Sequence, residues 1–149
     1  MKDMVRALEA LRVQTEFEVV EAGAAVSTAA QAVRRTESAV TTASGRCRVA
    51  DDELCRAMQA TRLNPALVAS LRSLFRAERV ELSATQSALG RDRAREAGAR
   101  AALADLRNRE RSFERALDSA LAAEQRRLEA REAVQADEAW LQRRMRTIG

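Results

Sequence analysis

Residues 19–57 read VVEAGAAVSTAAQAVRRTESAVTTASGRCRVADDELCRA, a stretch in which small apolar residues recur every seven positions. One line of this repeat is mostly β-branched and consists of Val19, Val26, Val33, Val40, Cys47 and Leu54. The line three positions later is mostly alanine and consists of Ala22, Ala29, Thr36, Ala43, Ala50 and Ala57. A heptad pattern kept for about six repeats predicts a long helix packed along another helix. Two paired helices enclose no concave interior for a reaction, so the pattern argues against an enzyme.

The only strong break in the sequence is Asn64-Pro65, which marks the start of a second helix. Asparagine is a favoured N-cap, and proline fits the first helical position because its missing N–H is not needed there. A connection this short makes the two helices antiparallel. We expect one coiled-coil domain over residues 1–149, with helices at about 4–61 and about 65–146 and a turn at about 62–64. Within the first helix, Gly45 is the most favourable place for a kink or restart, and the sequence leaves open whether one occurs.

The second helix has apolar lines of its own. One contains Phe75, Leu82, Leu89, Leu103 and Leu117, and the line three positions on contains Ala99, Leu106, Phe113, Ala120, Val134 and Leu141. Large side chains facing small ones let two helices approach closely and interdigitate. The predicted fold is therefore all-α, a long antiparallel two-helix coiled-coil hairpin with a C-terminal helical overhang. A monomeric hairpin and a homodimeric four-helix bundle both fit these lines.

The overhang follows from the unequal lengths of the helices. With a turn near residue 63, residue i faces roughly residue 126 − i, so the second helix loses its partner near residue 122. The remaining segment still has an apolar stripe, made of Leu128, Val134, Leu141 and Met145 with Trp140 beside it. An apolar stripe without a partner in its own chain indicates a partner elsewhere. Trp140 is then either a docking anchor or a cap on terminal packing.

Composition supports a helical, charged protein. The apolar content of 46% includes 32 alanines, which leaves few large side chains for a globular core. The net charge is +4, with nine basic and nine acidic residues in 1–63 and seventeen basic and thirteen acidic residues in 64–149. The densest basic stretches, Arg91–Arg95 and Arg107–Arg111, are interrupted by other residues and lack aromatic side chains for base stacking. A solvated helix face is the better interpretation, and a nucleic-acid-binding helical rod or generic coiled-coil scaffold is the alternative.

The residue types needed for most catalytic and metal sites are missing. There is no histidine, and no glycine-rich phosphate loop. The two cysteines, eight positions apart, do not form a zinc motif; Cys47 lies on the apolar line and Cys55 just off it. We therefore expect no catalytic residue, cofactor, metal or small-molecule substrate. No export signal and no apolar run long enough to span a bilayer is found, so we expect a cytoplasmic protein.

Two stretches resemble a known family. Residues 129–139, EAREAVQADEA, resemble an acidic repeat leading into Asp-Glu-x-Ala, and the stretch from Pro65 to Leu82 resembles the start of a second helix. Together with an alanine-rich first helix, they are similar to the FliJ/SctO family of flagellar export and type III secretion. The alanine- and arginine-rich composition is most similar to Hrp-type systems.

The resemblance implies a non-catalytic central stalk. Such a protein inserts into the hexameric secretion ATPase, couples it to the export gate protein, and escorts export chaperones. It would be cytoplasmic and peripherally associated with the membrane-bound secretion apparatus. Trp140 and Leu141 would be anchors, and Arg131, Arg143 and Arg144 would meet acidic loops. The candidate protein-interaction residues are Arg131, Val134, Asp137, Glu138, Trp140, Leu141, Arg143 and Arg144.

Overall fold

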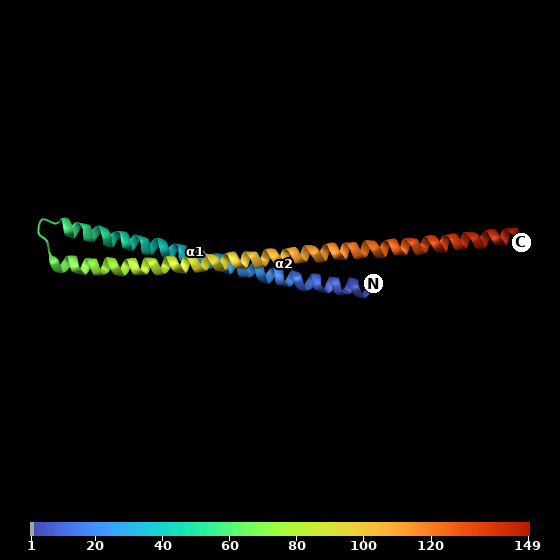
Figure 1. The fold of residues 1–149 in the computed structure, drawn as a ribbon, viewed down its shortest axis with the longest axis horizontal. Coiled ribbons are helices and arrows are strands. Elements are labelled where there is room, and N and C mark those ends of the chain that lie inside the picture. The colour runs from blue at the N-terminus through green and yellow to red at the C-terminus, as the bar shows by residue number, and fades with distance from the viewer. Residues whose placement is uncertain (1) are drawn as a thin grey trace. The chain divides into compact units, whose positions relative to one another are not determined.

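The computed structural model describes residues 2–149, which form two helices and no strand. Helix α1 spans Lys2–Gln59 and helix α2 spans Pro65–Ile148. The chain reverses between them, so that α2 returns along α1 (Figure 1). The all-α antiparallel two-helix hairpin expected from the heptad lines is confirmed.

Both helices take part in two compact units. One unit contains residues 2–20 of α1 with Ala104–Gly149, which is the rest of α2 and the last residue of the chain. The other contains Glu21–Leu103, and therefore includes the turn. Each unit packs a part of α1 against a part of α2. The single coiled-coil domain expected over residues 1–149 stays a prediction.

The turn is longer than expected. Helix α2 begins at Pro65, as the Asn64-Pro65 pair predicts, and Asn64 caps it: its side-chain Oδ1 accepts a hydrogen bond from the Leu67 N–H at 3.3 Å. Helix α1, however, ends at Gln59 rather than near residue 61. The register also differs from the expected one, since Thr36 contacts Asp92 where the expected spacing pairs it with residue 90.

The heptad lines of α1 form the contact with α2. All twelve of their residues are buried or half-buried, and Val33, Ala43, Ala50 and Leu54 are the most deeply buried. On α2, the expected residues from Phe75 to Ala120 are likewise buried or half-buried. Helix α1 runs without interruption through Gly45, so it does not restart there.

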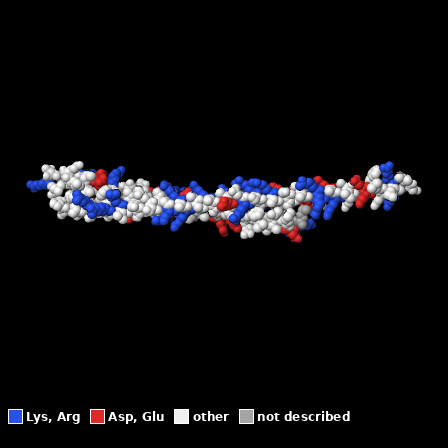
Figure 2. Space-filling model, viewed as in Figure 1, with Lys and Arg blue, Asp and Glu red and all other residues white. Residues whose placement is uncertain are grey.

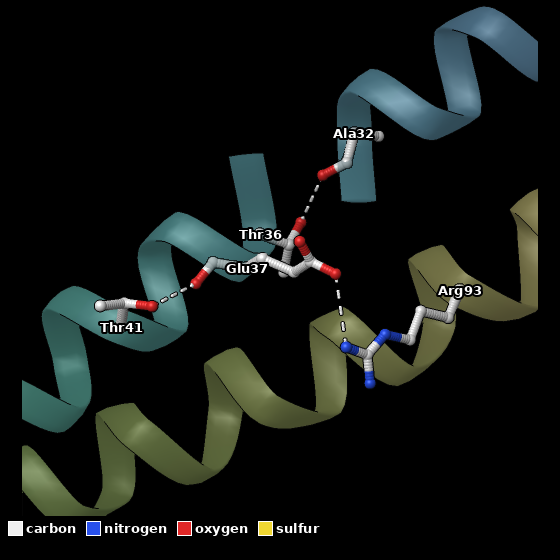
Figure 3. A network of polar contacts seen from close by, with 5 residues as sticks. All are labelled: Ala32, Thr36, Glu37, Thr41 and Arg93. Carbon is white, nitrogen blue, oxygen red and sulfur yellow. Dashed lines mark hydrogen bonds and ion pairs between the residues drawn. The ribbon is translucent and has the colours of Figure 1, made fainter. Parts of the chain in front are cut away.

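Polar residues also occupy the contact between the helices, which counting apolar residues does not reveal. In the unit that contains the turn, the half-buried positions of α2 include Glu78, Thr85, Asp92 and Glu96. The Thr36 hydroxyl lies within hydrogen-bond reach of both the Asp92 carboxylate and the Ala32 carbonyl, 2.8 Å away. Figure 3 shows the neighbouring cross-helix ion pair, in which the Arg93 guanidinium lies 3.4 Å from the Glu37 carboxylate. A short polar layer therefore fixes which residues of the two helices face each other.

Candidate protein-interaction site

Helix α1 reaches along α2 as far as residue 128. In the unit that contains both chain ends, Lys2, Val5 and Arg6 of α1 and Leu121, Glu124 and Leu128 of α2 line a cavity of about 430 Å³. Leu128 therefore lies beside the start of α1, although it remains 43% exposed, so α2 keeps a neighbour beyond the expected limit near residue 122. From Glu129 to the C-terminus, every residue except Ala139 is exposed. The overhang is this segment, residues 129–149.

One face of the overhang is apolar. Val134, Leu141, Met145 and Ile148 follow one another at spacings of seven, four and three, which places them on one side of a helix. Each is more than half exposed. Leu117 and Ala120 belong to the same heptad lines nearer the turn, and there they are buried under α1. The overhang thus continues the packing face of the coiled coil without a helix to cover it. Ile148 was missed from the sequence, although it lies on the line of Leu141 one heptad later.

The candidate residues divide into three groups around the helix. At about 100° per residue, Glu138 falls on the apolar face together with Val134 and Leu141, and Arg131 lies at one edge of that face. Asp137, Trp140 and Arg144 form a neighbouring row on one side of that face. Arg143 lies on the opposite side of α2, so a partner that contacts only the apolar face does not reach it. The binding roles of all eight residues stay predictions.

Trp140 is held by a contact within its own helix. The Arg144 guanidinium lies over the indole ring, 5.1 Å from its centroid. A cation in this position is attracted to the face of the ring, and four residues apart is the spacing at which helix side chains meet. The ring remains 55% exposed. One side of the indole is thus ordered against Arg144, while much of the rest stays open to a partner.

Charged side chains on the overhang are largely free to meet a partner. Just before it, Arg127 lies 3.4 Å from Glu124, and Gln125 donates a hydrogen bond to Glu129 at 3.0 Å. Within the described residues, Arg131, Arg143 and Arg144 take part in no ion pair. Ordering these solvated guanidiniums against a partner's carboxylates would add electrostatic steering to the apolar contact.

The remaining candidate features lie outside the overhang. A groove of about 610 Å³ beside Val33 and Ala97 is bordered by charged side chains, of which Arg93 pairs with Glu37 and Arg100 with Glu96. Cys47 is half-buried in the helix contact and Cys55 is exposed, and both are free thiols. Among residues 2–149, no cluster of three or more His, Cys, Asp or Glu side chains is placed to hold a metal ion. Neither described helix is apolar enough over a sufficient length to cross a membrane.

Comparison of the chain with protein-family models, with curated proteins and with solved structures finds no match in any of the three.

Proposed function

We propose that this chain is a non-catalytic central stalk of a type III secretion ATPase complex. The observation that supports the proposal most directly is the uncovered apolar face of the overhang. Exposed apolar side chains that continue a coiled-coil face, beside a partly open tryptophan, are typical of a surface that binds another protein. The resemblance of residues 129–139 to the FliJ/SctO family supplies the identity of that partner.

In this proposal, the overhang docks onto the hexameric secretion ATPase. Trp140 and Leu141 provide the apolar anchors, while Arg131 and Arg144 meet acidic loops. Arg143, on the opposite side of the helix, contributes only if the partner surrounds the helix, as a ring does. The family resemblance adds coupling to the export gate protein, contact with export chaperones, and a cytoplasmic location at the membrane-bound apparatus.

The decisive experiment adds the full chain to its cognate secretion ATPase and follows ATP hydrolysis. A stalk should raise turnover when present at about one chain per hexamer. Replacing both anchors, Trp140→Ala with Leu141→Ala, should return turnover to the level of the ATPase alone. The melting temperature should stay nearly the same, since neither side chain packs against α1.

A matched control removes exposed apolar side chains from α1 instead of from the overhang. Phe17 and Val20 are 70% and 71% exposed on α1, so Phe17→Ala with Val20→Ala deletes comparable apolar area. This variant should keep its stimulation of ATP hydrolysis. Equal loss in both variants would contradict the overhang as the docking site. Unchanged hydrolysis, together with salt-sensitive retardation of DNA, would instead favour the nucleic-acid-binding alternative.

A further inference from the structure

The net charge of the protein is concentrated around the turn. Residues 54–77, which include the end of α1, the turn and the start of α2, contain four arginines and no acidic residue. The rest of the chain carries the other 22 of the 26 basic residues against all 22 acidic ones. We call residues 54–77 the tip; its arginines are Arg56, Arg62, Arg72 and Arg76. All four are exposed, and within the described residues none forms an ion pair.

The tip also exposes apolar side chains from three consecutive parts of the hairpin. Met58 comes from the last turn of α1, Leu63 from the connection and Leu67 from the first turn of α2, and each is about half exposed or more. On the face shown in Figure 2, the end of the hairpin near the turn is mostly uncharged, with scattered basic atoms. Elsewhere on that face, basic and acidic side chains alternate. The tip thus combines positive charge with leucine and methionine.

We propose that the tip binds the surface of an anionic lipid bilayer. The exposed leucines and Met58 would enter the boundary between headgroups and acyl chains, and the arginines would contact lipid phosphates. Clustered basic residues next to exposed apolar ones are the combination that holds a peripheral protein on anionic lipid. The long apolar stems of arginine let its guanidinium stay at the headgroups while neighbouring side chains insert. The binding involves residues other than the overhang, so it goes beyond the ATPase-docking function.

A bilayer fits these features better than nucleic acid or an acidic protein. Phosphates of a nucleic acid would satisfy the arginines but leave Leu63 and Leu67 in water. The nearest aromatic ring, Phe75, is half-buried and has Arg79 over it at 5.7 Å, so it is not free to stack on bases. A groove on a protein would cover one face of a helix. Here the apolar side chains come from both helices and from the turn between them, an arrangement that suits insertion into a fluid surface.

The positions of the arginines along the helices predict unequal contributions. Arg62 is in the turn, and Arg56 is one helical turn before the end of α1. Arg76 is eleven residues beyond the start of α2, about 16 Å along its axis at 1.5 Å per residue. Electrostatic attraction in physiological salt fades over roughly 8 Å. Loss of Arg62 should therefore weaken binding more than loss of Arg76.

The test is sedimentation of the full chain with lipid vesicles. Vesicles of phosphatidylglycerol and phosphatidylcholine should bind the protein, and vesicles of phosphatidylcholine alone should not. Arg62→Gln with Arg72→Gln should weaken binding roughly tenfold or more. The matched control, Arg107→Gln with Arg109→Gln, removes the same charge from exposed positions outside the tip and should bind as the unaltered chain does.

A second pair of variants tests insertion. Leu63→Ser should weaken vesicle binding, whereas Val80→Ser, which alters a side chain that is 70% exposed but outside the tip, should not. Absence of binding to the anionic vesicles, or equal losses in the tip and control variants, would overturn the proposal. Binding that depends on the arginines but not on Leu63 would overturn the insertion of apolar side chains and leave attraction between arginines and lipid phosphates as the only contact. None of these outcomes involves the overhang, so they leave the ATPase experiment independent.

Discussion

Thr36 takes the place of an alanine in the small-residue line of α1, and its hydroxyl makes a contact between the helices. The hydroxyl reaches the Asp92 carboxylate on α2, whose side chain is only 19% exposed. Thr36→Val keeps the shape of the side chain but removes the donor. We expect a loss of about 1–2 kcal/mol, because a largely buried carboxylate would lose a hydrogen-bond partner. Thermal unfolding should show a melting temperature lower by about 3–6 °C.

Thr28 provides the matched control for this prediction. Its hydroxyl bonds only to the Ala24 carbonyl, at 3.0 Å within its own helix, and its side chain is exposed. Thr28→Val should therefore change the free energy of unfolding by less than about 0.5 kcal/mol. If both variants unfold at the same temperature, the contact with Asp92 contributes nothing to stability.

At the scale of the helices, two glycines lie at positions where alanine would favour the helix more strongly. Gly45 and Gly90 lie inside unbroken helices, and a Cβ atom built on either would have no neighbour within 4 Å. Gly45→Ala and Gly90→Ala should each stabilise the protein by about 0.5–1 kcal/mol, since alanine loses less backbone entropy in a helix. The midpoint of urea unfolding should rise for both. A lower midpoint for Gly45→Ala alone would mean that α1 needs local distortion at this position.

Particular positions show which elements could be predicted from the sequence. The start of α2 was predictable because Asn64 and Pro65 carry local signals for an N-cap and a first turn. The end of α1 was not predictable, since Gln59, Ala60 and Thr61 include no residue that stops a helix. The polar layer was missed because Asp92 and Glu96 occupy contact positions where a search for apolar periodicity finds only gaps.

The candidate site was predictable in part, because the apolar heptad lines of α2 continue into the overhang. Val134 and Leu141 continue lines that are visible in the sequence, so the existence of an uncovered face could be inferred. Its starting point could not: Leu128, which is 43% exposed, lines a cavity together with the first residues of α1, so α1 extends farther along α2 than the expected spacing allows. The position of Arg143 on the opposite side of α2 follows from helix geometry, but the family resemblance alone gave no reason to separate it from Arg144.

For the chain as a whole, the residues that stabilise the hairpin are different from those proposed to bind the ATPase. Removing residues 129–149 deletes no side chain that α1 covers, so the melting temperature should change by less than about 2 °C. Removing residues 1–20 deletes a segment of similar length that packs on α2 and leaves Leu117 and Ala120 uncovered. That truncation should lower the melting temperature by several degrees, because exposing buried leucine and alanine costs apolar burial.

The two truncations should have opposite effects on function and stability. The chain lacking residues 129–149 should fold normally, measured by circular dichroism and thermal unfolding, yet fail to stimulate ATP hydrolysis. A fall of several degrees in its melting temperature would instead show that the overhang packs against something in the isolated protein. Sedimentation equilibrium would then identify it, because a homodimeric four-helix bundle would cover the same apolar face and would dissociate when the overhang is removed. If the overhang serves only to bind the ATPase, the truncated chain should be a monomer that keeps its melting temperature and no longer stimulates ATP hydrolysis.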